Sequence, residues 1–223
     1  MFERMISLIG RDKFSKLQTT NVLVVGIGGV GGYALEALAR SGIMNISIID
    51  YDKIEITNLN RQIITSNDNI GLNKVDVAKE RVIKINPDIK ITIFNKSLNK
   101  DNIDFILENK YDYIIDACDT IDTKVLIIEK SLKYKFKLIS CMGTANKTNQ
   151  ALLSITELSK TSNDPIAKIL RKKIKTLKIN KKIYVVSSTE MPIANKILGT
   201  NSYIPGIAGL LCASYVINDI TKK

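Results

Sequence analysis

The chain has 223 residues, 45% of them hydrophobic, with a formal net charge of +11 and no histidine. The lack of histidine excludes Ser-His and Cys-His nucleophilic arrangements, and three widely spaced cysteines without a C-x-x-C pair exclude the usual structural zinc sites. No run of about 20 apolar residues is present to span a membrane, so we expect a cytoplasmic protein without a membrane partner.

The stretch at 21–61 has the pattern of a nucleotide-binding unit. Two short helices are predicted before it by the apolar spacing of residues 2–18, and a β-branched run at 22–25 predicts its first strand. Glycine permits a sharp turn and a close approach of the backbone to phosphate, and the amides of a helix from about Val30 would donate to that phosphate. The spacing G-x-G-x-x-G is met by Gly26, Gly28 and Gly31, with Gly29 as an additional small residue.

A second strand is predicted at 46–49, and Asp50 at its carboxyl end is placed to accept hydrogen bonds from a ribose. The polar residues that follow are unusual for a protein that transfers hydride. Cationic and amide side chains on the phosphate side of one pocket suit charge neutralisation on a triphosphate, although each alone also fits a solvated surface. These residues are Asp52, Asn58, Arg61 and Lys74.

The following elements alternate between helix and strand. We predict helices from about Asn73 to Pro87, at 101–109 and at 121–134, and strands at 89–94, 113–116 and 137–141. A further strand at 151–156 is expected to be antiparallel. The fold class is therefore α/β, a Rossmann-like doubly wound, mainly parallel sheet with a C-terminal antiparallel extension. Within a single domain at 1–223, we expect 1–150 to form the nucleotide-binding core and 151–223 to face the substrate.

Two aspartates, Asp116 and Asp119, flank the end of a predicted strand, at the sheet edge where α/β proteins bind ligands. Mg²⁺ prefers carboxylate and water oxygens, so one of the two is a candidate ligand. Cys118 between them is interpreted as a small buried residue rather than a nucleophile. At the same edge, the turn after residue 141 offers two polar residues toward a substrate carboxylate, Thr144 and Asn146.

Taken together, these motifs resemble the adenylating enzymes of the ubiquitin-activating family, which includes the bacterial activators of molybdopterin synthase and of the thiamin sulfur carrier. The shared motifs are the glycine turn, the strand-end aspartate, N-x-x-R-Q at 58–62, G-x-x-K at 71–74 and D-x-x-D at 116–119. The resemblance implies that they bind ATP and magnesium and promote attack of a carboxylate on the α-phosphate. It assigns Asp50 to the ribose, Asn58 to a phosphate or ribose oxygen, Arg61 and Lys74 to charge on the triphosphate and transition state, Asp119 to magnesium, and Arg4 to the ATP of a partner subunit.

The segment at 157–171 also resembles a narrower family, the tRNA threonylcarbamoyladenosine dehydratases, through K-T-x-x-D-P-[IL]-A-x-x-x-R. Asp164 is a predicted helix cap, with Pro165 at the first helical position. Residues 160–182 hold nine lysines or arginines against Asp164 alone. Such a cluster suits phosphate backbones or, equally, a solvated lysine-rich helix. We assign tRNA binding to Lys168, Arg171, Lys172, Lys173 and Lys175.

Two later segments extend the second resemblance, V-x-S-x-E within 185–190 and S-Y-I-P-G at 202–206, which leads into an apolar helix to Ile220. Between them, 191–202 is expected to be a mobile loop near the site. The resemblance then runs essentially from Phe2 to Ile220.

The dehydratase resemblance implies a reaction on tRNA that carries threonylcarbamoyladenosine next to the anticodon. The threonine carboxylate attacks the α-phosphate of MgATP and pyrophosphate leaves; the ureido nitrogen of the modification then displaces AMP and closes a ring, with net loss of water. The substrate supplies both nucleophiles, which agrees with a chain that lacks histidine. The resemblance also implies a homodimer and a bound alkali cation, sodium or potassium, and it makes a sulfur-transfer protein a candidate partner.

Three alternatives remain open on the sequence alone. An activator of a small sulfur-carrier protein would adenylate a Gly-Gly carboxylate with the same front half, but it would carry zinc-binding cysteine pairs and a catalytic thiol. A Rossmann module that binds NAD would not need Arg61 and Lys74. An RNA-binding protein with a vestigial site would bind tRNA without forming AMP.

Overall fold

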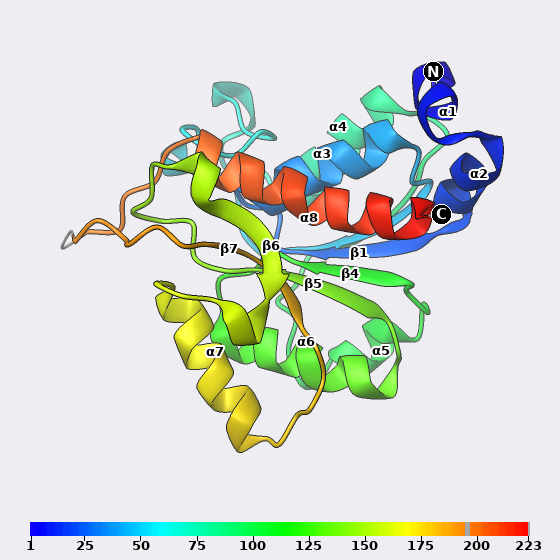
Figure 1. Cartoon of the computed structure of the whole chain (residues 1–223). Coiled ribbons are helices and arrows are strands. Elements are labelled where there is room, and N and C mark those ends of the chain that lie inside the picture. The colour runs from blue at the N-terminus through cyan, green and yellow to red at the C-terminus, as the bar shows by residue number, and fades with distance from the viewer. Residues whose placement is uncertain (195–196, 223) are drawn as a thin grey trace.

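The structure is a computed structural model that describes residues 1–194 and 197–222. Within these residues the centre of the molecule is a seven-stranded sheet in the order β3-β2-β1-β4-β5-β7-β6 (Figure 1). All neighbouring strands are parallel except β6 and β7, which are antiparallel. The strands are β1 (Asn21–Val25), β2 (Asn45–Ile49), β3 (Lys90–Phe94), β4 (Tyr113–Asp116), β5 (Lys137–Cys141), β6 (Leu153–Glu157) and β7 (Tyr184–Ser188).

Helices cover both faces of the sheet (Figure 1). In β1, Val22 and Val24 face the core beneath α3, α4 and α8, whereas Leu23 and Val25 face the core above α5, α6 and α7. A strand buried on both faces is apolar throughout, which explains why β1 reads as an uninterrupted hydrophobic run. The helices are α1 (Glu3–Ile9), α2 (Arg11–Thr19), α3 (Gly31–Ser41), α4 (Lys74–Ile85), α5 (Ile103–Leu107), α6 (Ile121–Lys133), α7 (Pro165–Thr176) and α8 (Tyr203–Thr221).

The last of these helices, α8, packs directly on α3. Their backbones approach so closely that a Cβ on Gly209 would lie 2.2 Å from the carbonyl oxygen of Val30, so only glycine fits there. By length and composition α8 would pass for a membrane-spanning helix, and it does so alone among the described residues. It is also a core helix, because its own residues Ile204, Ala208, Cys212 and Val216 are fully buried.

Most helices and strands in the structure begin and end within two residues of the predicted bounds. The antiparallel direction predicted for 151–156 is confirmed for β6. The helix predicted at 101–109 is shorter, because the side chain of Asn102 bonds back to Asn99 and Ser97 and forms a turn before α5. The sequence patterns did not predict β7. This strand inserts between β5 and β6 and brings residue 188 to the sheet edge where β1, β2 and β4 end.

Candidate functional site

The glycine turn joins β1 to α3 at the carboxyl edge of the sheet. Gly26 has a left-handed φ of +86°, and a Cβ on it would lie 2.9 Å from the carbonyl oxygen of Ala117. A Cβ on Gly31 would lie 1.7 Å from the carbonyl oxygen of Gly26. A Cβ on Gly28 would meet nothing closer than 3.9 Å, so there is open space above the turn. The 11-residue helix α3 begins directly after this turn, so its amino end adjoins the turn, as in a phosphate-binding site.

Asp50 lies beside this turn at the end of β2, and its side chain is buried. Its carboxylate accepts hydrogen bonds from the backbone N–H of Ile27 at 2.6 Å and of Asp52 at 2.9 Å. The carboxylate thus fixes the glycine turn to β2. A carboxylate has about four acceptor sites, so Asp50 retains sites for the ribose hydroxyls that the sequence predicts.

Lys74, in the first turn of α4, reaches the same edge. Its ammonium group lies 2.6 Å from a carboxylate oxygen of Asp52, and its backbone N–H donates to the Asp52 carbonyl at 3.0 Å. The Lys74 side chain is 6% exposed, whereas that of Asp52 is 47% exposed. The lysine is therefore held in one position at the rim of the turn, with the aspartate open to a ligand on its other side.

Arg61 lies next to the glycine turn, since its Cγ is 3.4 Å from the position of a Cβ on Gly29. Its guanidinium donates to the Thr57 carbonyl at 2.8 Å and to the side-chain oxygen of Asn60 at 3.0 Å. Both acceptors are neutral, so they orient the guanidinium and leave its charge for an anion. The side-chain oxygen of Asn58 accepts from a backbone N–H three residues earlier and so fixes the turn that carries Arg61.

Gln62, which the sequence offered only as part of the N-x-x-R-Q motif, is buried beneath Gly28. Its Nε2 lies 3.9 Å from the position of a Cβ on Gly28, and its Oε1 has no hydrogen-bond partner within the described residues. An unpaired buried amide oxygen costs about 1–3 kcal/mol. The Nε2 group, by contrast, borders the open space at Gly28 and is placed to donate a hydrogen bond to a ligand there.

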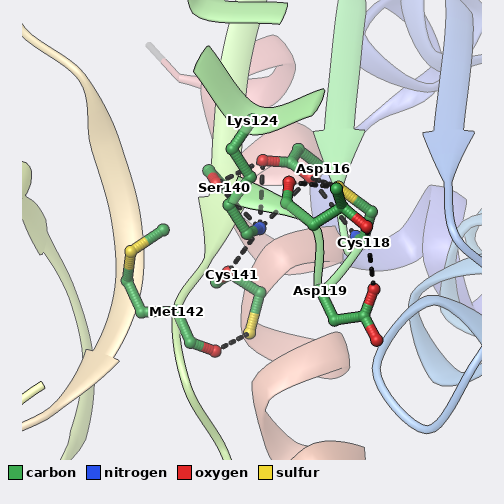
Figure 2. A network of polar contacts seen from close by, with 8 residues as sticks. Asp116, Cys118, Asp119, Lys124, Ser140, Cys141 and Met142 are labelled. Carbon is green, nitrogen blue, oxygen red and sulfur yellow. Dashed lines mark hydrogen bonds and ion pairs between the residues drawn. The ribbon is translucent and has the colours of Figure 1, made fainter. Parts of the chain in front are cut away.

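Behind the turn, Asp116 and Lys124 form a fully buried ion pair (Figure 2). The Lys124 ammonium lies 3.1 Å from the Asp116 carboxylate and donates to the Cys141 carbonyl at 2.8 Å, and the Ser140 hydroxyl also donates to Asp116. Burial lowers the pKa of Lys124, but the negative charge of Asp116 outweighs this and raises the pKa overall. The Lys124 ammonium therefore keeps its charge, and the pair joins β4, β5 and α6.

Cys118 belongs to the same cluster, and its thiol donates to Asp116 at 2.9 Å (Figure 2). Burial, and then the neighbouring Asp116 charge, raise the pKa of this thiol well above its usual range. A thiol with a raised pKa is a poor nucleophile, which agrees with the interpretation of Cys118 as a packing residue.

Asp119 is exposed and lies to the side of this cluster, where it accepts from the Thr120 hydroxyl at 3.3 Å (Figure 2). In residues 1–194 and 197–222, no three cysteines or carboxylates gather to hold a metal ion. Magnesium in nucleotide sites is held by one or two carboxylates together with phosphates and water. The residues present therefore fit a magnesium ion that arrives with a nucleotide.

The other half of the carboxyl edge of the sheet is formed by a loop at 142–149, for which the sequence predicted only a turn after residue 141. Glu190, just after β7, accepts from the backbone N–H of Thr148 and of Asn149, each at 2.9 Å, and these bonds lower its pKa. Asn146, predicted to face a substrate carboxylate, instead accepts from the Gly199 N–H at 2.6 Å. Its left-handed φ of 57° turns the loop toward the 191–202 segment, of which residues 195–196 lie outside the described part.

The basic helix α7 starts where the sequence predicted, but its five assigned cations fall into two sets. Arg171 donates to the Thr161 carbonyl at 2.9 Å, and Lys173 pairs with a carboxylate on α6. The other three are exposed and recur at i, i+4 and i+7, which places them along one side of the helix. We call this set the α7 stripe: Lys168, Lys172 and Lys175.

Arg4 is exposed on α1, which packs on α2 through the rings of Phe2 and Phe14, 5.2 Å apart. Because α2 leads into the amino end of β1, α1 lies near that end (Figure 1), whereas the glycine turn follows the carboxyl end of β1. The structure does not bring Arg4 to the site of its own chain. Its contact with the ATP of a partner subunit stays a prediction.

The geometry above agrees with comparison to known proteins. The model of the ThiF family matches residues 2–223, nearly the whole chain. The chain belongs to the ThiF family. This match spans the glycine turn, Asp50, the D-x-x-D motif at 116–119 and α7. The family resemblance predicted from the sequence is therefore confirmed.

Relatives within the ThiF family are close. The tRNA threonylcarbamoyladenosine dehydratase of Bacillus subtilis strain 168 is 36% identical over 240 residues, which cover 99% of this chain and 94% of that protein. The dehydratase of Escherichia coli K12 is 37% identical over 169 residues, covering 76% of this chain and 63% of that protein. A solved structure of the E. coli tRNA N6-threonylcarbamoyladenosine dehydratase in complex with ATP matches with a TM-score of 0.94 and 32% identity, over 98% of this chain and 93% of that chain. The predicted α/β fold class is confirmed.

Proposed function

We propose that the chain is an ATP-dependent enzyme that cyclises threonylcarbamoyladenosine in tRNA by adenylating its carboxylate. The observation that carries the proposal is the placement of Arg61 and Lys74 beside an open glycine turn. Two fixed cations beside a phosphate-binding turn suit a reaction in which negative charge develops on a phosphate. The B. subtilis relative and the E. coli structure, both matched over nearly their full length and named as dehydratases, supply the substrate class.

The roles follow from the positions of the side chains. The amides of the glycine turn hold the phosphates, and Asp50 accepts from the ribose. Arg61 and Lys74 stabilise charge at the α-phosphate while the substrate carboxylate attacks it and pyrophosphate leaves. Asp119 would hold magnesium, which would supply positive charge to the leaving phosphates. The ureido nitrogen of the substrate then attacks the acyl carbon, loses its proton and expels AMP, so the chain need supply no nucleophile.

The tRNA is held through its phosphate backbone. The α7 stripe presents three exposed ammonium groups on one side of a helix, and such contacts position a nucleic acid without reading its sequence. Arg171 and Lys173 contribute by holding α7 against its own chain.

The active form is a homodimer in the cytoplasm. The outer side of α8 exposes Tyr203 and Leu210 at 45% and 46%, and α1 exposes Leu8 at 80%. Large apolar side chains left exposed on two helices suit burial against a second copy, which would also bring Arg4 toward a neighbouring site. Sedimentation or light scattering of the purified chain tests the dimer.

Two further partners belong to the proposal by family resemblance. An alkali cation, sodium or potassium, is tested by assaying turnover in sodium, potassium and tetramethylammonium salts. A sulfur-transfer protein is tested by measuring whether its addition changes turnover or is retained by the immobilised chain.

The alternative, an activator of a sulfur-carrier protein, needs a reactive thiol. Cys141 and Cys212 are buried, and burial raises the pKa of Cys118. The described residues therefore contain no thiol suited to sulfur transfer, and the dehydratase proposal is favoured.

The deciding experiment is AMP release from ATP with tRNA that carries the threonylcarbamoyl group and with unmodified tRNA, followed by mass analysis of the nucleosides. We expect AMP only with the modified tRNA, together with a nucleoside lighter by one water. AMP release with a Gly-Gly-terminated protein and not with tRNA would instead support the sulfur-carrier alternative. tRNA binding without AMP from any substrate would support a vestigial site.

A further inference from the structure

A second buried ion pair, between Lys147 and Asp164, lies outside the nucleotide site. Both side chains are at most 1% exposed, and the ammonium lies 3.0 Å from the carboxylate. Lys147 also donates to the Gly143 carbonyl at 2.8 Å. The carboxylate in turn accepts from the Gly143 N–H at 3.1 Å and caps α7 by accepting from the Ala167 N–H at 2.9 Å. The pair therefore joins the 142–149 loop to the first turn of the basic helix.

The α7 stripe begins one turn after this junction. The backbone N–H of Lys168 donates to the Asp164 carbonyl at 3.0 Å, so the first residue of the stripe is bonded to the residue that Lys147 holds. A displacement of the α7 stripe is therefore expected to displace the loop as well. The pair is shielded from water, so water cannot replace either charged partner.

The loop also contacts the opposite side of the edge. The Lys147 carbonyl accepts from the side chain of Asn201 at 2.9 Å, and the neighbouring Asn146 exchanges two hydrogen bonds with Gly199. Between these two, the Thr200 carbonyl accepts from the side chain of Asn60 at 3.3 Å. Asn60 in turn accepts from the Arg61 guanidinium at 3.0 Å. A continuous series of polar contacts thus runs from the cap of α7 to the arginine beside the glycine turn.

We propose that Lys147 is a positioning residue that couples tRNA bound on the α7 stripe to the placement of Arg61 in the adenylation site. The inference rests on the proposed function. A buried ion pair is not needed for stability, because well-packed apolar residues of similar volume stabilise a core as well or better. Its value here is geometric, since a charged pair with four defined hydrogen bonds fixes the loop in one register.

The test removes both charges at once with Lys147→Met and Asp164→Asn. Asparagine still caps a helix, and no lone charge is left buried, so the double variant is expected to fold. Binding of ATP and binding of modified tRNA are measured separately, followed by single-turnover AMP formation with both saturating. We expect both dissociation constants within about threefold of wild type and a rate reduced by about 10- to 100-fold, because a small misplacement of a catalytic group slows chemistry without weakening binding.

The matched control removes an ion pair at the other end of the sheet, with Lys137→Met and Asp219→Asn, where the two groups lie 2.6 Å apart. This control is expected to form AMP at the wild-type rate. A second variant, Lys147→Arg, retains the charge and is expected to recover a large part of the lost rate.

Three results would overturn the role of Lys147. The first is a double variant that forms AMP as fast as wild type. The second is a double variant whose slower AMP formation is accounted for by weaker binding of both substrates. The third is a Lys147→Arg variant that forms AMP as slowly as the double variant. Wild-type chain is assayed alongside. Absence of AMP from wild type counts against the proposed function itself and is thereby distinguished from a fast double variant, which counts against Lys147 alone.

Discussion

After the proposed function, we call the glycine-turn side of the carboxyl edge the nucleotide half and the side formed by the 142–149 loop the substrate half. The two halves are held by different kinds of contact. In the nucleotide half, glycines let backbone segments touch directly, as where Gly31 meets the Gly26 carbonyl. In the substrate half, single side chains bridge segments that are far apart in the chain, as where Glu190 binds the amides of Thr148 and Asn149. Backbone packing makes a rigid turn for phosphates, whereas side-chain bridges make loops that one substitution can release.

The largest effect is expected for Gly31→Ala. The added Cβ would overlap the Gly26 carbonyl oxygen at 1.7 Å, and backbone atoms cannot move aside as a side chain would. We expect a loss of about 4–5 kcal/mol or more in unfolding free energy, together with loss of ATP binding. Urea unfolding measures the first and equilibrium binding the second. Gly28→Ala is the control, because its Cβ enters open space and should leave the unfolding free energy within about 1 kcal/mol.

The next largest loss in unfolding free energy is expected for Lys124→Met. It leaves the Asp116 carboxylate buried and unpaired, which costs about 3–5 kcal/mol in unfolding free energy. Lys130→Met, which breaks the partly exposed pair with Asp104, should cost clearly less, because water screens that pair. Similar losses in the two variants would show that the nucleotide half does not depend on the Asp116–Lys124 pair.

Arg61→Ala should act on chemistry rather than on folding. The guanidinium contacts only neutral oxygens of its own turn, so its removal is expected to change the melting temperature little. Loss of a charged group at the reacting phosphate should slow AMP formation by about 10²–10³-fold. Lys74→Ala is expected to slow it comparably, and Arg40→Ala on α3 to have no effect. Near-normal turnover in either site variant would remove that residue from the proposed mechanism.

Charge reversal of the α7 stripe, with glutamate at 168, 172 and 175, separates binding from catalysis in the substrate half. Each lost phosphate contact should reduce the slope of log affinity against log salt, by about 2 to 3 in total. ATP binding should not change. Filter binding across a salt series measures the slope, and reversal of three exposed lysines elsewhere, Lys84, Lys90 and Lys96, serves as the control. Equal effects in both sets would indicate a response to net charge alone.

The smallest effect is expected for Glu190→Gln. Backbone amides lower the pKa of Glu190 below its ordinary value of 4.5, so the carboxylate stabilises the fold above that pH. The contribution is lost as the pH falls through the lowered pKa of the folded state. We expect the variant to melt about 1–2 °C below wild type at pH 7, with the difference shrinking as the pH is reduced below 4.5. A difference that does not vary with pH would contradict this.

The same contrast explains what could be predicted from the sequence. The glycine turn and Asp50 were recognisable because their requirements are local and limit the residue type at each position. Their assignment to phosphates and ribose stays a prediction. The Lys147 pair, the Glu190 bridges and β7 join positions 17 to 45 residues apart or depend on sheet order, which no local pattern records. In α7 the count of cations was visible, but the inward direction of Arg171 and Lys173 depends on partners outside the helix.

The position of α8 in the chain has a consequence for biosynthesis. Pro205 lies 3.2 Å from the position of a Cβ on Gly29, and Gly209 packs on the residue before α3, so the last of the described helices covers the outside of the nucleotide turn. A ribosome-bound chain that has emerged only as far as β7 would leave the apolar surface beneath α8 uncovered. Until α8 docks, that apolar surface stays exposed to solvent, and the glycine turn lacks the contacts that Pro205 and Gly209 make with its outside.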